Sequence, residues 1–236
     1  MNAVKDPCEI DRARMVEEQL RGRGIAMARV LEAMREVPRH LFVAHQWQDR
    51  AYCDEALPSR EGQTISQPYM VAVMTQELDV REGMRVLELG TGTGYQTAVL
   101  CWMVGASGRV YTIERVASLG ELARGRLEAM GISNVHYFIG DGSAGWPEGL
   151  WYEDRPVLFD RILVTAGAPQ VPEPLIAQLK TGGAMVVPVG DGESQTLRRV
   201  VKLAAGRIEE SDSLGCRFVP LVGEYGWQAP ATAPGH

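Results

Sequence analysis

The stretch VLELGTGTGY, residues 86–95, decides the fold of this 236-residue chain. Its apolar start is typical of a buried strand, and its glycines at alternate positions predict a turn that leads into an apolar helix. A glycine-rich turn between a strand and a helix is typical of open parallel sheets, which bind ligands beyond the carboxyl ends of their strands. Because glycine has no Cβ, a ligand can come close to the backbone of such a turn.

Short apolar runs and helical segments alternate outward from this turn. We expect strands at 85–89, 109–113, 135–139, 161–165 and 184–189, and helices at 95–104, 117–130 and 173–178. Gly182-Gly183 predicts a turn before the fifth strand, and the connection at 142–151 has a weaker pattern. Two more strand-like runs, 197–203 and 214–219, follow without a helix between them. The pattern predicts an α/β fold with a doubly wound, mostly parallel seven-stranded sheet and an antiparallel C-terminal edge.

The N-terminal part has a different pattern. Apolar residues recur with helical spacing in 12–21 and in 30–37, so we expect N-terminal helices within residues 1–50. Residues 51–68 are rich in loop-forming types, and we expect their side chains to lie outside the core. We therefore expect one domain over 1–227, with a cofactor-binding core at 60–190, C-terminal strands at 195–223 and a disordered tail at 228–236.

Composition argues against several classes of protein. The chain is 45% hydrophobic and 23% charged, with a net charge of −6, which suits a soluble globular domain and not a nucleic-acid binder with a basic face. No stretch reaches the ~18 apolar residues of a membrane span, and no signal peptide is visible, so we expect a cytoplasmic protein. The cysteines are too widely spaced for a metal site or a disulfide framework, and we expect free thiols with Cys101 in the core. These cysteines are Cys8, Cys53, Cys101 and Cys216.

The glycine spacing separates two classes of cofactor. A dinucleotide fingerprint is Gly-x-Gly-x-x-Gly, but the sixth position is Tyr95 when counted from Gly90 and Thr97 when counted from Gly92. A dehydrogenase is therefore disfavoured. S-adenosylmethionine fits better, because it needs no pyrophosphate site. We expect Glu88 to supply negative charge near its cationic groups and the amides of the turn to meet its carboxylate.

Two further acids follow the next two expected strands. Glu114 ends the second strand, where a carboxylate can accept hydrogen bonds from both ribose hydroxyls. Asp141, between Gly140 and Gly142, follows the third strand and is expected to accept from the adenine amino group. Each acid alone would more often be a surface carboxylate. Together with the glycine turn, three acids at successive strand ends predict a cofactor site.

The substrate is indicated by a resemblance. Residues 62–70, GQTISQPYM, resemble the signature loop of the protein-L-isoaspartate O-methyltransferases. Matching blocks in the same order extend the resemblance over roughly residues 11–223: 38–43, 86–100, 164–169, 187–190 and 217–221. The resemblance implies a Rossmann-like class I methyltransferase that uses S-adenosyl-L-methionine and releases S-adenosyl-L-homocysteine. It also implies methylation of L-isoaspartyl residues in damaged proteins, which starts their repair through a succinimide.

The same resemblance assigns site residues. In that family the loop covers the cofactor, and its serine, regarded as the active-site residue, corresponds to Ser66. Two departures are Gly167, where alanine is commoner, and Arg60-Glu61, which could alter peptide preference. The implied cofactor-binding residues are Gln63, Thr64, Ile65, Ser66, Glu88, Gly90, Thr91, Gly92, Gly94, Glu114, Arg115, Gly140 and Asp141.

Methyl transfer to a carboxylate needs little acid–base catalysis. A free carboxylate with a pKa near ~4 is already ionised at neutral pH, so no general base is required. We therefore expect the Ser66 hydroxyl to orient the acceptor and not to act as a nucleophile. A serine in a loop can also simply bond its own backbone.

Two alternatives for the function stay open: a methyltransferase acting on another carboxylate, such as an aspartate of a modified peptide, and a non-catalytic binding module. The expected partners are isoaspartyl peptides and proteins, with no nucleic acid or membrane, for a monomeric enzyme.

Overall fold

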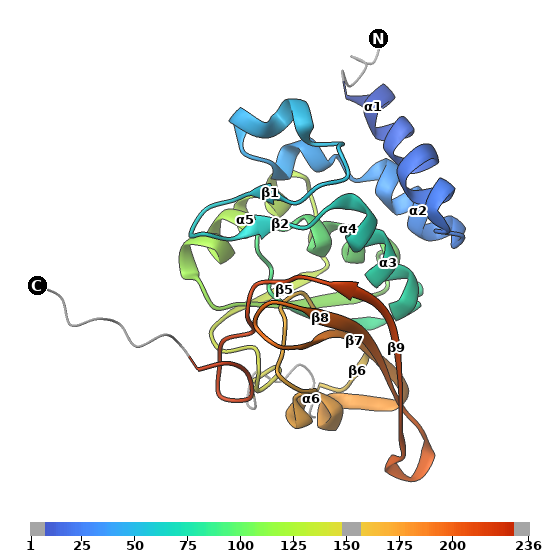
Figure 1. Cartoon of the computed structure of the whole chain (residues 1–236), viewed down its shortest axis with the longest axis vertical. Helices are drawn as coiled ribbons and strands as arrows, with labels where there is room; N and C mark the ends of the chain where they lie inside the picture. The colour runs from blue at the N-terminus through green and yellow to red at the C-terminus, as the bar shows by residue number, and fades with distance from the viewer. Residues whose placement is uncertain (1–7, 148–156, 229–236) are drawn as a thin grey trace, which may run out of the picture.

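The computed structural model describes residues 8–147 and 157–228, and a seven-stranded sheet runs through it (Figure 1). The strand order is β5-β4-β3-β6-β7-β8-β9; the pairs among β3 to β7 are parallel, and β8 and β9 add antiparallel strands at one edge. The predicted doubly wound, mostly parallel sheet with an antiparallel C-terminal edge is therefore confirmed. Its strands are β3 Arg85–Leu89, β4 Arg109–Glu114, β5 Val135–Ile139, β6 Phe159–Val164, β7 Leu179–Gly190, β8 Gln195–Lys202 and β9 Ile208–Cys216.

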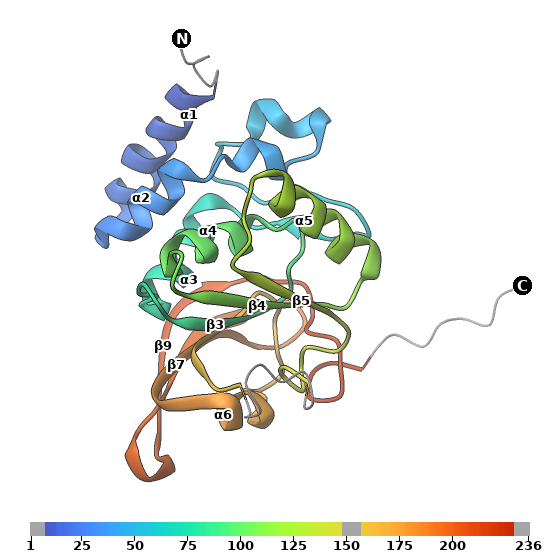
Figure 2. The same cartoon turned by 180° about the vertical axis from the view of Figure 1, so that it is seen from behind.

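Helices lie on both faces of the sheet. Figures 1 and 2 show α3, α4 and α5 on one side, together with the N-terminal helices, and the short α6 on the other side. Every helix in the described part of the chain falls short of the length and apolar character that crossing a membrane requires. The α-helices are α1 Glu9–Arg14, α2 Ala28–Glu36, α3 Pro68–Leu78, α4 Tyr95–Val104, α5 Ala117–Ala129 and α6 Glu173–Gln178.

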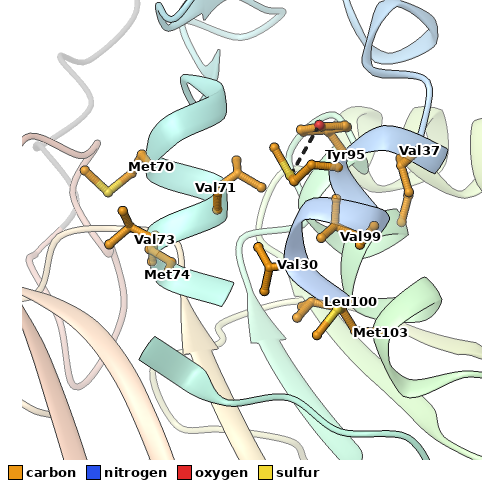
Figure 3. Close-up of a cluster of buried hydrophobic side chains, with 14 of the residues drawn as sticks. Val30, Val37, Met70, Val71, Val73, Met74, Tyr95, Val99, Leu100 and Met103 are labelled. Atoms are coloured by element: carbon orange, nitrogen blue, oxygen red, sulfur yellow. Dashed lines mark hydrogen bonds between the residues drawn. The ribbon is translucent and has the colours of Figure 1, made fainter. Parts of the chain in front are cut away.

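Alternate residues of the central strands enter two different cores. Val86 and Val110 belong to the core under α3 and α4, whereas Leu87 and Tyr111 belong to the core on the opposite face. This follows from the two-residue period of a strand, and a strand covered on both faces is apolar at nearly every position. Figure 3 shows the first core, where side chains of α2, α3 and α4 meet and the hydroxyl of Tyr95 contacts a methionine sulfur. The glycine turn after β3 therefore starts from a firmly packed strand.

One expectation for residues 1–85 needs correction, and one helix in this part of the chain was not predicted. Residues 51–68 are not outside the core, because Tyr52, Leu57 and Ile65 are buried and the short strands β1, Leu57–Pro58, and β2, Thr64–Ile65, form an antiparallel pair. Their burial depends on distant partners that a local pattern does not show. Helix α3 was not predicted, because apolar residues surround most of PYMVAVMTQEL and leave no clear helical period, as expected for a helix that is buried at most of its positions.

The N-terminal helical run is confirmed, but it is not uniform. Helix α1 continues into a π-helical segment η1, Met15–Leu20, and a 3₁₀ turn η2, Arg21–Arg23. Two further 3₁₀ segments, η3 Arg39–Phe42 and η4 His45–Arg50, lead into the loop before β1.

The C-terminal expectations also change in detail. β7 begins at Leu179 and includes Gly182-Gly183, which do not form the predicted turn. The last strand is Ile208–Cys216 and not 214–219, because an edge strand exposed on both faces shows no apolar alternation. A 3₁₀ turn, η5 Ala204–Gly206, separates it from β8. The predicted tail and part of the weak 142–151 connection lie outside the described residues. Cys101 is buried, as predicted.

Candidate active site

One cavity opens at the carboxyl ends of β3, β4 and β6, where an open parallel sheet binds its ligands. The space that it encloses together with its open mouth is about 990 Å³. The glycine turn forms its floor, and two other parts of the chain cover it. The lining comes mainly from residues 63–66, 89–93, 113–116 and 219–222, together with Gly142, Thr165 and Ala166.

Most of the predicted site residues meet in this cavity. Nine line it: Gln63, Thr64, Ile65, Ser66, Gly90, Thr91, Gly92, Glu114 and Arg115. Glu88, Gly94, Gly140 and Asp141 lie outside this lining. Sequence reasoning did not assign Tyr95 and Gln96 of α4, Val71 and Met74 of α3, or the C-terminal segment 219–222 to the site. Two of these had a signal, since the blocks that carried the family resemblance include 86–100, which contains Tyr95 and Gln96, and 217–221.

Gly90 cannot be replaced without moving its neighbour. Its φ is +95°, and an added Cβ would lie 2.3 Å from the Thr165 hydroxyl oxygen. That hydroxyl is 2.8 Å from the carbonyl oxygens of both Leu89 and Gly90, so it ties the turn to the end of β6. Gly94 has a different role. It is the N-cap of α4, and its Cα faces Ala123 of α5 and not the cavity.

Glu114 is the acid that faces the cavity. One carboxylate oxygen accepts the backbone amide of Gly92 at 2.9 Å, and the other accepts that of Val116 at 2.9 Å. These bonds fix the carboxylate against the glycine turn. Because an ionised carboxylate has about four acceptor positions, two remain for a ligand. A vicinal diol, such as that of a ribose, fits this arrangement.

Glu88 lies beneath the turn and is fully buried. One of its oxygens accepts the hydroxyls of Thr97 at 2.6 Å and Thr112 at 2.7 Å, and Thr112 is 2.6 Å from the Thr91 hydroxyl. Burial raises the pKa of Glu88 to about 7, although both hydrogen bonds lower it, and nearby Glu114 raises it further. Glu88 is therefore connected to the cavity lining through Thr112 and Thr91, and its contribution of negative charge near a bound cofactor stays a prediction.

Asp141 holds another part of the chain and not an open position in the cavity. Its Oδ1 accepts the amide of Ser143 at 2.8 Å, and its Oδ2 accepts the amide of Glu224 at 2.7 Å. The Ser143 hydroxyl accepts the Tyr225 amide at 3.0 Å. We call residues 219–227 the C-terminal strap. Asp141 thus fixes the strap over the cavity, while its neighbour Gly142 lines the cavity itself.

The strap is also tied at its far end. The indole N–H of Trp227 donates to the Gly167 carbonyl at 3.0 Å, and the Trp227 amide donates to the Leu221 carbonyl at 2.7 Å. The Leu221 amide in turn donates to Gly167 at 2.8 Å. These bonds fold the strap into a tight turn against the end of the sheet.

Ser66 lies at the boundary between two cavities. It lines the cofactor-side cavity and also a second cavity formed by Arg23, Gln67, Tyr69 and residues 214–219. Thr64 and Thr165 line both as well. A ligand in one cavity can therefore meet a ligand in the other beside the Ser66 side chain.

Among the described residues that line these two cavities, Glu114 is the only carboxylate, and no histidine occurs. Cys216 lines the second cavity, where burial raises the pKa of its thiol to about 11, so it stays protonated near neutral pH. The arrangement offers hydroxyls, backbone amides, the two acceptor positions left on Glu114 and the guanidinium groups of Arg23, Arg115 and Arg217. It suits a reaction that needs positioned reactants more than proton transfer.

The fold and this cavity define a Rossmann-like class I methyltransferase. The chain belongs to the protein-L-isoaspartate O-methyltransferase family. The family model described as Protein-L-isoaspartate(D-aspartate) O-methyltransferase matches residues 11–226. A curated Protein-L-isoaspartate O-methyltransferase of Trichlorobacter lovleyi is 52% identical over 220 residues, which cover 93% of this chain and 97% of the relative.

Solved structures agree with this assignment. A structure of a protein-L-isoaspartate O-methyltransferase superimposes with a TM-score of 0.80 at 32% identity, covering 91% of this chain and 67% of that chain. A beta-aspartate methyltransferase from Plasmodium falciparum, solved in complex with S-adenosyl-L-homocysteine, gives a TM-score of 0.74 at 24% identity, covering 88% of this chain and 96% of that one. The second likeness supports the fold.

Proposed function

We propose that this chain transfers the methyl group of S-adenosyl-L-methionine to the free carboxylate of L-isoaspartyl residues in damaged proteins. The backbone amide nitrogen that follows the residue then attacks the methyl ester and releases methanol, which gives a succinimide whose hydrolysis returns some normal aspartate. The observation that carries this proposal is the position of Ser66, which lines both a cavity whose floor suits the cofactor and a second cavity on its other side, where the acceptor would lie. The names of the relatives point to the same substrate.

The floor of the first cavity would hold the cofactor. Glu114 keeps two acceptor positions for the ribose hydroxyls, and Gly90 lets the backbone come close to the ligand. Thr91 and Gly92 complete the turn, and the strap closes the other side. When bound, S-adenosyl-L-methionine supplies a methyl group made electrophilic by the sulfonium. The protein contributes the position of that methyl group relative to Ser66.

The acceptor side needs a group that orients an ionised carboxylate. The Ser66 hydroxyl can donate to one oxygen and leave the other directed at the methyl carbon. An acceptor carboxylate that is already ionised needs no general base, so the reaction requires that its oxygen be positioned at the methyl carbon. Held in alignment at ~3 Å, two reactants recover several kcal/mol of entropy. The loop and the strap also keep water away from the reacting groups.

The remaining features of the proposal concern the whole protein. We propose one domain over residues 1–227, acting as a monomer in the cytoplasm on peptides and proteins and not on nucleic acid. The net charge of −6 supports an acceptor other than nucleic acid.

The test is methyl transfer to an isoaspartyl peptide beside its aspartyl twin of identical sequence. The proposal expects S-adenosyl-L-homocysteine to form at least about a hundredfold faster with the isoaspartyl peptide. The carboxylate of the aspartyl peptide would be misplaced relative to the methyl group, and a misplacement of about 1 Å can cost about a hundredfold in rate. Faster turnover of the aspartyl peptide would instead favour a methyltransferase for another peptide carboxylate. No turnover of either peptide, with cofactor binding intact, would overturn the assignment of the substrate.

A further inference from the structure

The start of helix α3 lacks a cap of its own. Gln67 occupies the N-cap position, but its side chain makes no hydrogen bond to the helix, and Pro68 has no N–H to donate. The first helical amide is that of Tyr69. Helix starts are usually stabilised by a short polar side chain at the N-cap, which accepts such an amide. The segment that directly follows Ser66 therefore needs a partner from elsewhere in the chain.

Asp54 is that partner. Its Oδ1 accepts the backbone amide of Tyr69 at 2.9 Å, although the two residues are 15 positions apart. Its Oδ2 lies 3.4 Å from the side-chain amide nitrogen of Gln67, which donates to it. A carboxylate at this position also faces the positive end of the helix dipole. Asp54 thus contacts the residue after Ser66 and the first amide of α3 at the same time.

A second set of contacts connects the same carboxylate to the N-terminal helices. The Arg23 guanidinium forms an ion pair with Asp54 and lies over the Tyr69 ring, with its central carbon 3.6 Å from the ring centroid. The Tyr69 hydroxyl donates to the Arg23 carbonyl at 3.3 Å. The Asp54 side chain is only 18% exposed, so this ion pair is partly shielded from water. Arg23 and Tyr69 also form one wall of the second cavity.

The backbone on both sides of Asp54 is fixed by one buried guanidinium. Arg39 is fully buried; it donates through Nε to the Ala51 carbonyl at 2.8 Å and through Nη2 to the Glu55 carbonyl at 3.5 Å. Gln19 adds a bond to the Tyr52 carbonyl at 2.9 Å. Asp54 therefore reaches α3 from a short segment that is itself held in place.

We infer that Asp54 is a positioning residue that holds Ser66 at the boundary of the two cavities by fixing the start of α3. Before Ser66, the pairing of β2 with β1 fixes the chain; after Ser66, Asp54 fixes it. Asp54 is absent from the lining of both cavities, so it acts through Gln67 and Tyr69. The inference rests on the proposed function, because that function gives Ser66 its role.

Three variants test the inference: Asp54→Ala, Asp54→Asn and the control Asp49→Asn, which changes an exposed carboxylate in η4. We expect Asp54→Ala to lower kcat on an isoaspartyl peptide by roughly ten- to a hundredfold, the loss that a small misplacement of a reacting group causes. Binding of S-adenosyl-L-homocysteine, measured by calorimetry, should stay within about twofold of wild type, since the floor is untouched. Asp54→Asn keeps one acceptor and should show a smaller loss of kcat. Asp49→Asn should match the wild type.

Hydrogen exchange gives a readout that does not depend on turnover. In Asp54→Ala the Tyr69 amide should exchange faster, while the amides of β3 stay protected. A second-site change, Gln67→Ser, places a capping residue at the N-cap and should restore part of kcat and of the Tyr69 protection in the Asp54→Ala background. Gln67→Ser alone serves as its control.

The outcomes separate the two proposals. Unchanged kcat in Asp54→Ala, or a lower kcat with unchanged Tyr69 exchange, would overturn the positioning role. A fall in cofactor affinity equal to the fall in kcat would also overturn it. If the wild type does not methylate an isoaspartyl peptide, the proposed function fails, and the exchange data still decide whether Asp54 fixes the start of α3.

Discussion

The floor of the cavity and its two covers are held by different kinds of contact. The floor consists of residues 88–94 and 112–116, and its bonds join neighbouring strand ends, such as Glu114 to Gly92 and Thr165 to Gly90. The covers are the loop at 51–69 and the C-terminal strap. In each cover one carboxylate makes a bond to a residue far away in the sequence: Asp54, inside the loop, accepts the Tyr69 amide, and Asp141 accepts the Glu224 amide of the strap.

This difference indicates that the floor and the covers contribute differently to cofactor binding and to the alignment of the reactants. The floor is rigid because it belongs to the packed sheet, so it sets the affinity for the cofactor. The loop carries Ser66 and therefore sets the alignment of the reactants, whereas the strap lies over the cofactor cavity and adds to the affinity for the cofactor. Variants in the floor and in the covers should therefore fail in different ways.

The largest effect is expected in the floor, from Gly90→Ala. We expect the variant to bind S-adenosyl-L-homocysteine at least about a hundredfold more weakly, because a left-handed backbone costs a non-glycine residue 1–3 kcal/mol and the new methyl group would meet Thr165. Calorimetry measures the affinity. Gly24→Ala is the matched control, since Gly24 has a similar φ of +94° but open space around it and lies outside the site.

Equal losses of cofactor affinity in Gly90→Ala and Gly24→Ala would contradict this account. They would show that general backbone strain, and not the contact with Thr165, decides the outcome.

A smaller effect is expected from the strap. Asp141→Ala removes the acceptor for the Glu224 amide, and we expect cofactor affinity to fall by roughly tenfold, because a hydrogen bond to a charged group contributes about 1.5–3 kcal/mol. Ser143→Ala removes only the bond to the Tyr225 amide and should give a milder form of the same change. Hydrogen exchange at residues 221–226, measured beside calorimetry, should rise in both variants.

A direct contact between Asp141 and the adenine predicts another pattern. In that case Asp141→Ala would lose affinity without faster exchange in the strap, and Ser143→Ala would behave as the wild type.

The smallest effect concerns Glu88 and pH. Because burial raises the pKa of Glu88 from 4.5 to about 7, the folded protein holds this proton more tightly than the unfolded chain. Folding is therefore favoured below pH 4.5, and this contribution is lost as pH rises toward 7. Glutamine does not titrate, so Glu88→Gln lacks this contribution, and we expect its Tm to fall by a few degrees less than that of the wild type between pH 5 and pH 8. A change of about 1 kcal/mol in the free energy of unfolding corresponds to about 2–4 °C in Tm for a chain of this size. Identical pH profiles of Tm in the variant and the wild type would show that Glu88 keeps the same charge in both states.

The sequence predicted the residues of the floor and of the loop that line the cavity, but not the bonds that hold the two covers in place. Gly90 and Glu114 belong to local patterns, a turn and a strand end, so their positions follow from the order of the elements. The direction of Glu88 was also predictable in principle. It alternates with Leu87 and Leu89, which enter the core on the α6 side, so its side chain points to the other face, beneath α4.

The roles of Asp54 and Asp141 could not be read from local patterns. Their partners lie 15 and 83 positions away, and only the tertiary fold brings them together. The position of β9 was missed for a similar reason: the strand is exposed at the sheet edge, so polar residues cost nothing there and leave no periodic signal.

The most direct test of the division between floor and covers measures two quantities on two variants, Glu114→Ala and Ser66→Ala. The quantities are the calorimetric Kd for S-adenosyl-L-homocysteine and the kcat on an isoaspartyl peptide at saturating cofactor. The account predicts that Glu114→Ala raises Kd by about a hundredfold with kcat changed little, because two hydrogen bonds to a charged group are lost. It predicts the reverse for Ser66→Ala: an unchanged Kd with kcat lowered by about tenfold or more. If Kd and kcat instead changed together in both variants, the floor and the covers would act as one unit, and the account would be wrong.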